Sequence, residues 1–214
     1  MKDNVLEIKN LVKDFPGVRA VNDVSFNIKK NTVHCLVGEN GAGKSTLIKI
    51  LTGAFIRTAG TILLDGKEYA ANNPKDANEK GISTLFQELN VVDQLTVAEN
   101  LTLGIEDTKL GFLQKTGKIK KIIEVLKNID PSISPKERVG RLSVAQKQII
   151  EIAKAVASDA DIIIMDEPTA ALTESEIERL FKIIKRLREQ DVTVIYISHR
   201  LDEIFELGDY VTVM

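Results

Sequence analysis

Eight consecutive residues, from Gly38 to Ser45, have the types and spacing needed to hold a phosphate group. They follow the pattern Gly-x-x-x-x-Gly-Lys-Ser, in which backbone N–H groups converge on an anion and the lysine reaches the terminal phosphates. An apolar segment, residues 33–37, leads into the loop, and a helical segment, residues 46–51, follows it. Because this order aims a helix N-terminus at the bound phosphates, we predict a nucleotide-binding P-loop.

The predicted contacts extend over the whole loop. Gly38, Gly41 and Gly43 are expected to let the backbone turn inward. Lys44 would reach the β- and γ-phosphates, and the Ser45 hydroxyl would bind Mg²⁺. The loop residues predicted to contact the ligand are Gly38, Glu39, Asn40, Gly41, Ala42, Gly43, Lys44, Ser45 and Thr46.

A second group of candidate residues ends another apolar segment. Residues 162–165 are followed by Asp166 and Glu167. In P-loop proteins a strand-end aspartate holds Mg²⁺, and Asp166 fits that role. Glu167 is predicted to be the general base that activates the attacking water. An isolated Asp-Glu pair is more often two solvated charges, so this interpretation depends on the upstream P-loop.

Two further polar residues each follow a predicted strand. His199 comes after residues 194–198, and Gln87 comes after residues 82–86. A neutral imidazole at His199 could hydrogen-bond the γ-phosphate and position the base and the water. Gln87 can offer an oxygen to Mg²⁺ or to the attacking water. Both residue types are common on surfaces, and only the P-loop context favours these roles.

The composition narrows the class of protein. The chain has 214 residues, 43% hydrophobic and 28% charged, with a net charge of −2, which is an ordinary globular composition without the basic surplus of general nucleic-acid binders. Its single cysteine, Cys35, excludes an intrachain disulfide and fits a reducing compartment. No apolar run reaches the roughly 18 residues of a membrane span. We expect a soluble, cytoplasmic protein whose membrane role, if any, comes through a partner.

Two kinds of strand are predicted. Residues 5–9 and 24–28 alternate between apolar and polar, and residues 61–64 precede a tight Asp65-Gly66 turn, as in half-exposed antiparallel strands. Nearly continuous apolar segments suit the central strands of a parallel sheet. These segments are 33–37, 82–86, 162–165 and 192–197, with 211–214 as one more strand in which the chain stops.

Between Gln87 and about residue 158 the pattern becomes helical. Thr96 and Glu99 form a predicted capping box, and another helix is expected to start near Ser143. Residues 104–117 are predicted to be a loop. A second capping box, at 173–176, is expected to open a helix that returns to the core. We therefore predict a helical subdomain, residues 88–158, inserted between two halves of an α/β core.

In this order, the segments resemble the nucleotide-binding domain of ATP-binding cassette (ABC) proteins over nearly the whole chain. Two more segments match that family: residues 142–146, Leu-Ser-Val-Ala-Gln, resemble its signature, and residues 170–173, Ala-Ala-Leu-Thr, follow the strand-end acids. Within the family, four segments look like the ATPase subunit of bacterial ribose/galactose/xylose-type importers. They are residues 15–18, 86–90, 95–100 and 196–201.

The resemblance implies an α/β fold, namely a P-loop NTPase cassette with a mostly parallel core sheet, an N-terminal antiparallel β subdomain and an inserted helical subdomain. The domain would span residues 1–214 and would be the first of two tandem cassettes in a longer chain. ATP and Mg²⁺ are the implied ligands. Phe15 would stack on the adenine, Ala20 would pack beside it, and Ser143 would face the γ-phosphate bound by the partner cassette.

The implied partners are transmembrane permease subunits, a second ABC cassette and, indirectly, a sugar-binding protein. The protein would hydrolyse ATP to energise sugar import from the inner face of the cell membrane. Alternatives are the ATPase of another ABC transporter, or a soluble ABC-type ATPase acting on ribosomes or nucleic acid. The latter typically needs long coiled-coil or basic segments, which this sequence lacks, so no nucleic acid is expected.

Besides Phe15, which stands where the family more usually has Tyr, the chain departs from the family pattern at three positions. Val144 and Ala145 stand where the signature has two glycines, and Thr173 replaces the more usual aspartate. A Cβ at Ala145 is expected to hinder close approach of the backbone to phosphate. The signature acts on the partner's ATP, so the site of Lys44 and Glu167 is expected to stay competent.

Overall fold

The computed structural model describes residues 4–85, 90–103, 108–109, 112–113 and 116–214. The chain divides into two compact units. Unit 1 comprises Met1–Gln87, Ala160–Pro168 and Phe181–Met214, and unit 2 comprises Glu88–Asp159 and Thr169–Leu180. Within the described ranges, no helix is both long enough and apolar enough to cross a lipid bilayer.

Unit 1 contains the predicted parallel sheet. Its strand order is β11-β3-β10-β9-β6, and every neighbouring pair in it is parallel. The strands are β3 (Val33–Val37), β6 (Ile82–Leu85), β9 (Ile162–Asp166), β10 (Thr193–Ile197) and β11 (Tyr210–Val213). Because the carboxyl ends of parallel strands share one edge, the segments that follow β3, β10 and β9 come out side by side.

An antiparallel sheet of order β2-β1-β4-β5 completes the strands of unit 1. They are β1 (Asn4–Phe15), β2 (Val18–Lys29), β4 (Ala59–Leu64) and β5 (Lys67–Glu68). The predicted turn is confirmed, since Asp65 and Gly66 have φ values of 50° and 76°. The predictions for β1 and β2 were too short. Asn10 and Asp23 take left-handed φ values of 48° and 54°, and the pairing shifts register near them, which interrupts the apolar alternation.

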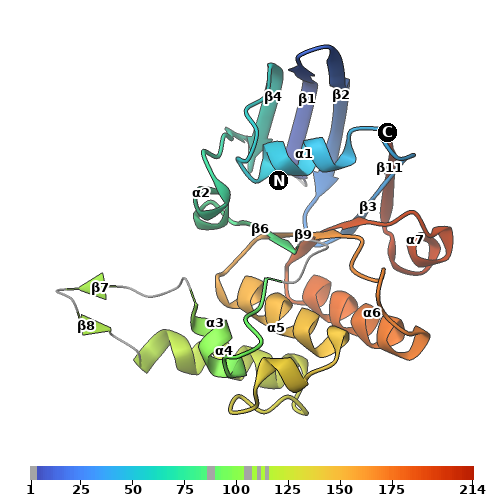
Figure 1. Cartoon of the computed structure of the whole chain (residues 1–214). Coiled ribbons are helices and arrows are strands. Elements are labelled where there is room, and N and C mark those ends of the chain that lie inside the picture. Colours follow the sequence, from blue (N-terminus) through green and yellow to red (C-terminus); the bar gives the residue numbers. More distant parts are fainter. Residues whose placement is uncertain (1–3, 86–89, 104–107, 110–111, 114–115) are drawn as a thin grey trace. The chain divides into compact units, whose positions relative to one another are not determined.

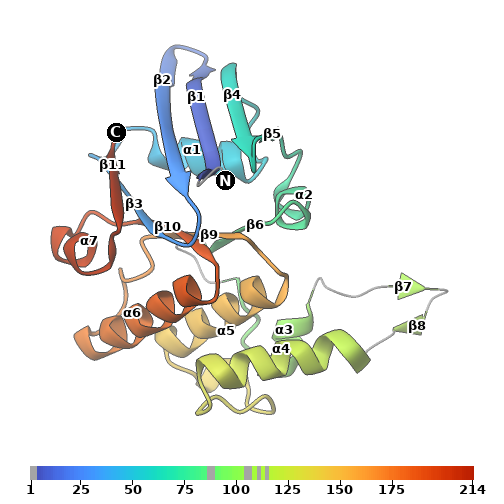
Figure 2. The same cartoon turned by 180° about the vertical axis from the view of Figure 1, so that it is seen from behind.

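Three helices belong to unit 1 alone. α1 (Lys44–Leu51) lies across one face of the antiparallel sheet (Figures 1 and 2), and its four apolar residues Leu47, Ile48, Ile50 and Leu51 are buried. α2 (Pro74–Glu79) was not predicted, although Asn73 caps it and a proline occupies its first turn, both of which favour a helix start. α7 (Leu201–Leu207) follows His199.

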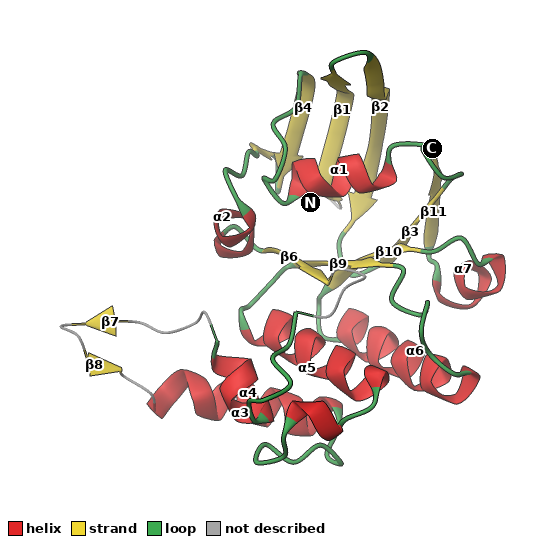
Figure 3. Cartoon of the chain, in the orientation of Figure 1, coloured by secondary structure: helices red, strands yellow, loops and turns green. Residues whose placement is uncertain are grey.

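Unit 2 is mainly helical (Figure 3). It contains α3 (Val97–Thr102), α4 (Thr116–Ile129), a 3₁₀ turn (Val139–Arg141), α5 (Val144–Ala157) and the first part of α6 (Glu174–Glu189). The capping box of Thr96 and Glu99 is confirmed. The prediction of a loop over residues 104–117 was wrong in part, because two short strands pair there, β7 (Thr108–Lys109) and β8 (Phe112–Leu113), and α4 already starts at Thr116.

Candidate functional site

The P-loop joins β3 to α1, and its glycines act in different ways. Gly41 and Gly43 have left-handed φ values of 90° and 99°, which disfavour any residue with a Cβ. A Cβ at Gly43 would also lie 2.4 Å from the carbonyl oxygen of Ala20, whereas one at Gly41 would meet nothing within 4 Å. Gly38 has no left-handed φ, but a Cβ there would lie 2.8 Å from the carbonyl oxygen of Met214. Gly38 therefore provides space, and not the turn predicted for it.

The start of α1 is prepared for an anion. Gly43 is its N-cap, and no described side chain caps this helix end. The first N–H groups of a helix have no partner within the helix, and together with the helix dipole they favour negative charge. The Lys44 ammonium donates hydrogen bonds to the carbonyl oxygens of Gly38, at 2.6 Å, and of Glu39, at 3.0 Å. A cation and free amide donors thus face the same space.

A cleft of about 340 Å³ opens at this point. It is lined by Ala20, Asn40, Gly41, Gly43, Lys44, Ser45, Thr46, Asp166 and Glu167. The structure thereby brings together most of the predicted loop residues, Ala20 and the two strand-end acids. Glu39, Ala42 and Gly38 belong to the same loop without lining the cleft.

The two acids of the cleft, Asp166 and Glu167, lie close enough for their negative charges to repel each other. Burial raises the pKa of the Asp166 carboxyl, the neighbouring Glu167 carboxylate raises it further, and Lys44 and Lys49 act in the opposite direction. A divalent cation would relieve this repulsion. The described residues contain no cluster of three or more His, Cys, Asp or Glu suited to a metal. Mg²⁺ is usually bound by one or two carboxylates plus substrate phosphates, and the Asp166 carboxylate lines this cleft.

Glu167 and His199 form a pair beside the cleft. Nδ1 of His199 lies 3.1 Å from Oε1 of Glu167. Glu167 follows β9 with a left-handed φ of 48°, and its backbone N–H donates to the carbonyl oxygen of Ile197 on β10 at 3.0 Å. A glutamate in this backbone region is unusual and costs energy, and such strain concentrates at functional sites.

Phe15 remains outside this arrangement. The Phe15 ring packs edge-on against Phe55, with centroids 5.1 Å apart, and the ammonium of Lys13 lies 4.7 Å from its centre. Phe15 does not line the cleft. Gln87 lies outside the described residues, so its predicted role stays a prediction.

Ser143 belongs to unit 2 and caps α5. Its hydroxyl accepts a hydrogen bond from the N–H of Gln146, whose side chain accepts one from the N–H of Ser143. Ala145 is only 7% exposed and Val144 is 40% exposed. Ala145 is therefore largely buried, and the expectation that its Cβ hinders the approach of a phosphate stays a prediction.

Thr173 has a structural explanation. Its N–H and its hydroxyl both donate to the Glu176 carboxylate, at 3.0 and 2.9 Å, and these bonds lower the pKa of Glu176. Thr173 thus stabilises the beginning of α6, as its capping-box position predicts.

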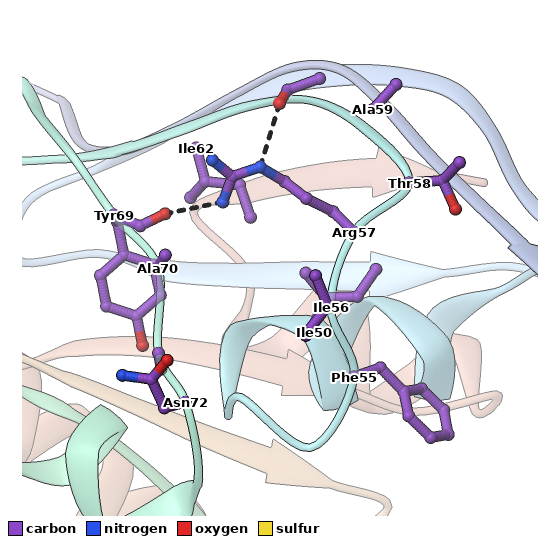
Figure 4. A pocket seen from close by; sticks show the side chains of 12 residues that line it. Ile50, Phe55, Ile56, Arg57, Thr58, Ala59, Ile62, Tyr69, Ala70 and Asn72 are labelled. Atoms are coloured by element: carbon purple, nitrogen blue, oxygen red, sulfur yellow. Dashed lines mark hydrogen bonds between the residues drawn. The ribbon is translucent and has the colours of Figure 1, made fainter.

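A second cavity, of about 360 Å³, lies near the other end of α1 (Figure 4). Its lining is largely apolar and includes Arg57, which donates to the carbonyl oxygens of Gly60 and Tyr69, each at 3.0 Å, and to the Glu68 carboxylate at 2.8 Å. The Tyr69 hydroxyl donates to the carbonyl oxygen of Leu51 at 2.6 Å. These bonds connect the loop after α1 to β4 and to the segment after β5.

Sequence reasoning missed Glu203. It is only 3% exposed, and its carboxylate accepts hydrogen bonds from Tyr196 and Ser198. An acid in the first turn of a helix is usually an exposed charge that complements the helix dipole. No sequence signal distinguishes a buried acid from such an exposed one.

Residues 21–170 match the sequence profile of the family described as ABC transporter. The chain belongs to the ABC transporter family. It is 49% identical over 213 residues to the ribose import ATP-binding protein of Shouchella clausii, and 45% identical over 216 residues to the galactose/methyl galactoside import ATP-binding protein of Clostridium perfringens. These alignments cover 98% and 100% of this ABC cassette but 42% of each relative. The chain thus spans less than half the length of these relatives.

The fold agrees with solved ABC cassettes. A dimeric cassette in a post-hydrolysis state, bound to ADP and Pi, superposes with a TM-score of 0.79 at 25% sequence identity. The superposition covers 98% of this chain and 94% of the solved one. The predicted family and the predicted fold class are both confirmed.

Proposed function

We propose that this cassette binds and hydrolyses ATP and thereby energises the import of a sugar through a membrane permease. The observation that carries the proposal is the cleft in which the uncapped start of α1, Lys44 and Asp166 adjoin the Glu167–His199 pair. A phosphate cradle next to a carboxylate with an oriented imidazole is the arrangement expected for attack of water on a γ-phosphate.

Each group in the cleft has a distinct role in this proposal. The N–H groups at the start of α1 and the Lys44 ammonium bind the phosphates and offset the charge that develops on them. Glu167 accepts the proton of the attacking water as general base. His199 orients the Glu167 carboxylate by donating from Nδ1, and only an imidazolium would donate from Nε2 to the γ-phosphate at the same time. The bond that breaks joins the γ-phosphorus to its bridging oxygen, and ADP and inorganic phosphate leave.

Mg²⁺ would be held by Ser45, Asp166 and Gln87, and it would neutralise charge between the β- and γ-phosphates. Burial and the neighbouring Glu167 carboxylate both raise the pKa of Asp166, which supports a cation at this position. Phe15 is proposed to stack on the adenine, and Ala20, which lines the cleft, is proposed to pack beside it.

A second cassette would complete the catalytic unit. Ser143 and the start of α5 would face the γ-phosphate held by that partner, as an anion site at a helix N-terminus. The dimeric cassette to which this chain is similar supports pairing with a second cassette, and the greater length of the relatives leaves room for a tandem cassette.

The transport role is proposed from the names of the relatives, which are import ATP-binding proteins for ribose and for galactose or methyl galactoside. In this proposal the protein is peripheral on the inner face of the cell membrane, bound to permease subunits. A sugar-binding protein would act on the other side and select the sugar.

The test is affinity purification of the tagged full-length protein from detergent-solubilised native membranes, followed by mass spectrometry, with an untagged strain as control. We expect a multi-span permease, with or without a sugar-binding protein, and loss of sugar uptake in cells carrying Lys44→Ala. Recovery of ribosomal proteins or nucleic acid without a permease would overturn the transport role.

A further inference from the structure

The carboxylate of Glu203 lies buried beside the segment that carries His199. Oε2 of Glu203 accepts hydrogen bonds from the Tyr196 hydroxyl at 2.8 Å and from the Ser198 hydroxyl at 2.6 Å. Its other oxygen, Oε1, lies 3.0 Å from Nη1 of Arg200. One carboxylate therefore contacts residues on both sides of His199.

The backbone around His199 is held by the same group. Ser198 Oγ, which donates to Glu203, also accepts a hydrogen bond from the backbone N–H of Arg200 at 3.0 Å. This bond spans His199 and closes a turn around it. Because 66% of the His199 side chain is exposed, packing contributes little to the direction of the ring, and the shape of the turn decides it.

Glu203 also connects this turn to the sheet that carries the catalytic base. Tyr196 is fully buried in β10 and lies opposite Met165 in the parallel register of β10 and β9. Glu167 follows β9 directly. The pairing of β10 with β9 thus fixes the position of the His199 turn relative to Glu167.

We infer that Glu203 is a positioning residue for ATP hydrolysis, which holds the turn at 198–200 so that Nδ1 of His199 faces Glu167. The inference rests on the proposed function, because it assigns Glu203 a part in that reaction. A buried carboxylate is costly unless its hydrogen bonds are satisfied. Tyr196 and Ser198 satisfy one oxygen of the carboxylate, Oε2, only while the turn keeps this shape. The other oxygen, Oε1, has the ion pair with Arg200 but accepts no hydrogen bond from a described residue.

The test measures ATP turnover of the full-length protein with its partners. Glu203→Gln keeps the size of the side chain but removes the charge facing Arg200. We expect kcat to fall about 10- to 100-fold, as for a misplaced catalytic group, with the KM for ATP unchanged. Asp202→Asn makes the same carboxyl-to-amide change at an exposed neighbour and should leave kcat at the wild-type value.

A double-mutant cycle with His199→Ala separates positioning from general structural damage. If Glu203 acts through His199, adding Glu203→Gln to His199→Ala should cause no further fall in kcat. Additive losses, or a raised KM, would overturn the inference. Should Glu203→Gln fail to fold, Ser198→Ala in the same cycle gives the same two outcomes.

The proposed function is checked in the same assay. Wild-type protein without ATP turnover, or turnover unaffected by Glu167→Gln, would overturn the function and the inference together. Normal turnover with additive losses would overturn the inference alone.

Discussion

Two cavities of nearly equal volume flank α1, and each is lined by a positively charged side chain. At the P-loop cleft, Lys44 donates hydrogen bonds to backbone carbonyls of its own loop. It lies next to a helix start without a side-chain cap and to the neighbouring carboxyls of Asp166 and Glu167. At the other cavity, Arg57 donates hydrogen bonds to the carbonyl oxygens of Gly60 and Tyr69 (Figure 4) and to the Glu68 carboxylate. The two cavities therefore have similar volumes but differ in how their polar groups are hydrogen-bonded.

The difference shows what makes a cavity a site. Arg57 donates to partly buried carbonyl oxygens and therefore stabilises the fold. Around Lys44, the amide donors and the ammonium could make further hydrogen bonds and ion pairs with a polyphosphate. A cavity can bind a polar ligand when some of its polar groups lack hydrogen-bond or charge partners within the protein.

The largest expected effect tests whether catalysis belongs to the P-loop cleft alone. Glu167→Gln should lower kcat by about 10²- to 10⁴-fold and keep nucleotide affinity, because the phosphate contacts remain. Steady-state ATP hydrolysis by the full-length protein measures this. Glu68→Gln, the same change beside Arg57, serves as control, and unchanged turnover in Glu167→Gln would remove it as the base.

Next in size is the effect on nucleotide affinity. Lys44→Ala should weaken ATP binding about 10- to 100-fold, since charge-assisted hydrogen bonds contribute roughly 1.5–3 kcal/mol. Titration calorimetry with ATP and Mg²⁺ measures the change. Arg57→Ala removes the other cation and should leave affinity intact. Equal weakening in both variants would mean that the comparison between the cavities is wrong.

For the free energy of unfolding we expect the opposite ranking, with Arg57→Ala having a larger effect than Lys44→Ala. Arg57→Ala should lower the free energy of unfolding by about 1–3 kcal/mol, because the carbonyl oxygens of Gly60 and Tyr69 lose their donor. Lys44→Ala should change it far less. Urea denaturation without nucleotide measures both, and a larger loss for Lys44→Ala would contradict the structural role of Arg57.

The smallest effect concerns pH. The folded protein raises the pKa of Asp166, chiefly by burial, so its contribution favours folding at acid pH and is lost as the pH rises through the folded pKa. Asp166→Asn should therefore raise the Tm of the nucleotide-free protein at neutral pH, and the gain should vanish on acidification. Exposed Asp202→Asn should show no gain, and a lowered Tm in Asp166→Asn would refute the electrostatic argument.

Much of this site could be predicted because it consists of short continuous segments at the ends of adjacent strands. The P-loop follows β3, His199 follows β10 and Asp166 ends β9, and β10 lies between the other two. An apolar run followed by a polar residue is visible in the sequence, and parallel pairing then gathers the polar residues at one edge.

The remainder depends on contacts between distant residues. Nothing near Phe15 in the sequence indicates that its ring packs against Phe55, 40 positions away. The burial of Glu203 depends on Tyr196 lying beneath the turn. The lengths of β1 and β2 were missed because left-handed residues at Asn10 and Asp23 break the alternation that defines a strand.

The start of α1 differs from those of α2, α3 and α5, which are capped by Asn73, Thr96 and Ser143. A nucleotide phosphate would supply the missing cap, so the ligand would finish a piece of secondary structure as well as occupy a cleft. Local unfolding of the P-loop and first turn should then be most frequent in the empty protein. The hydrogen-exchange rate of each backbone amide at residues 44–46 would thereby measure how often the protein has ATP bound in the cell.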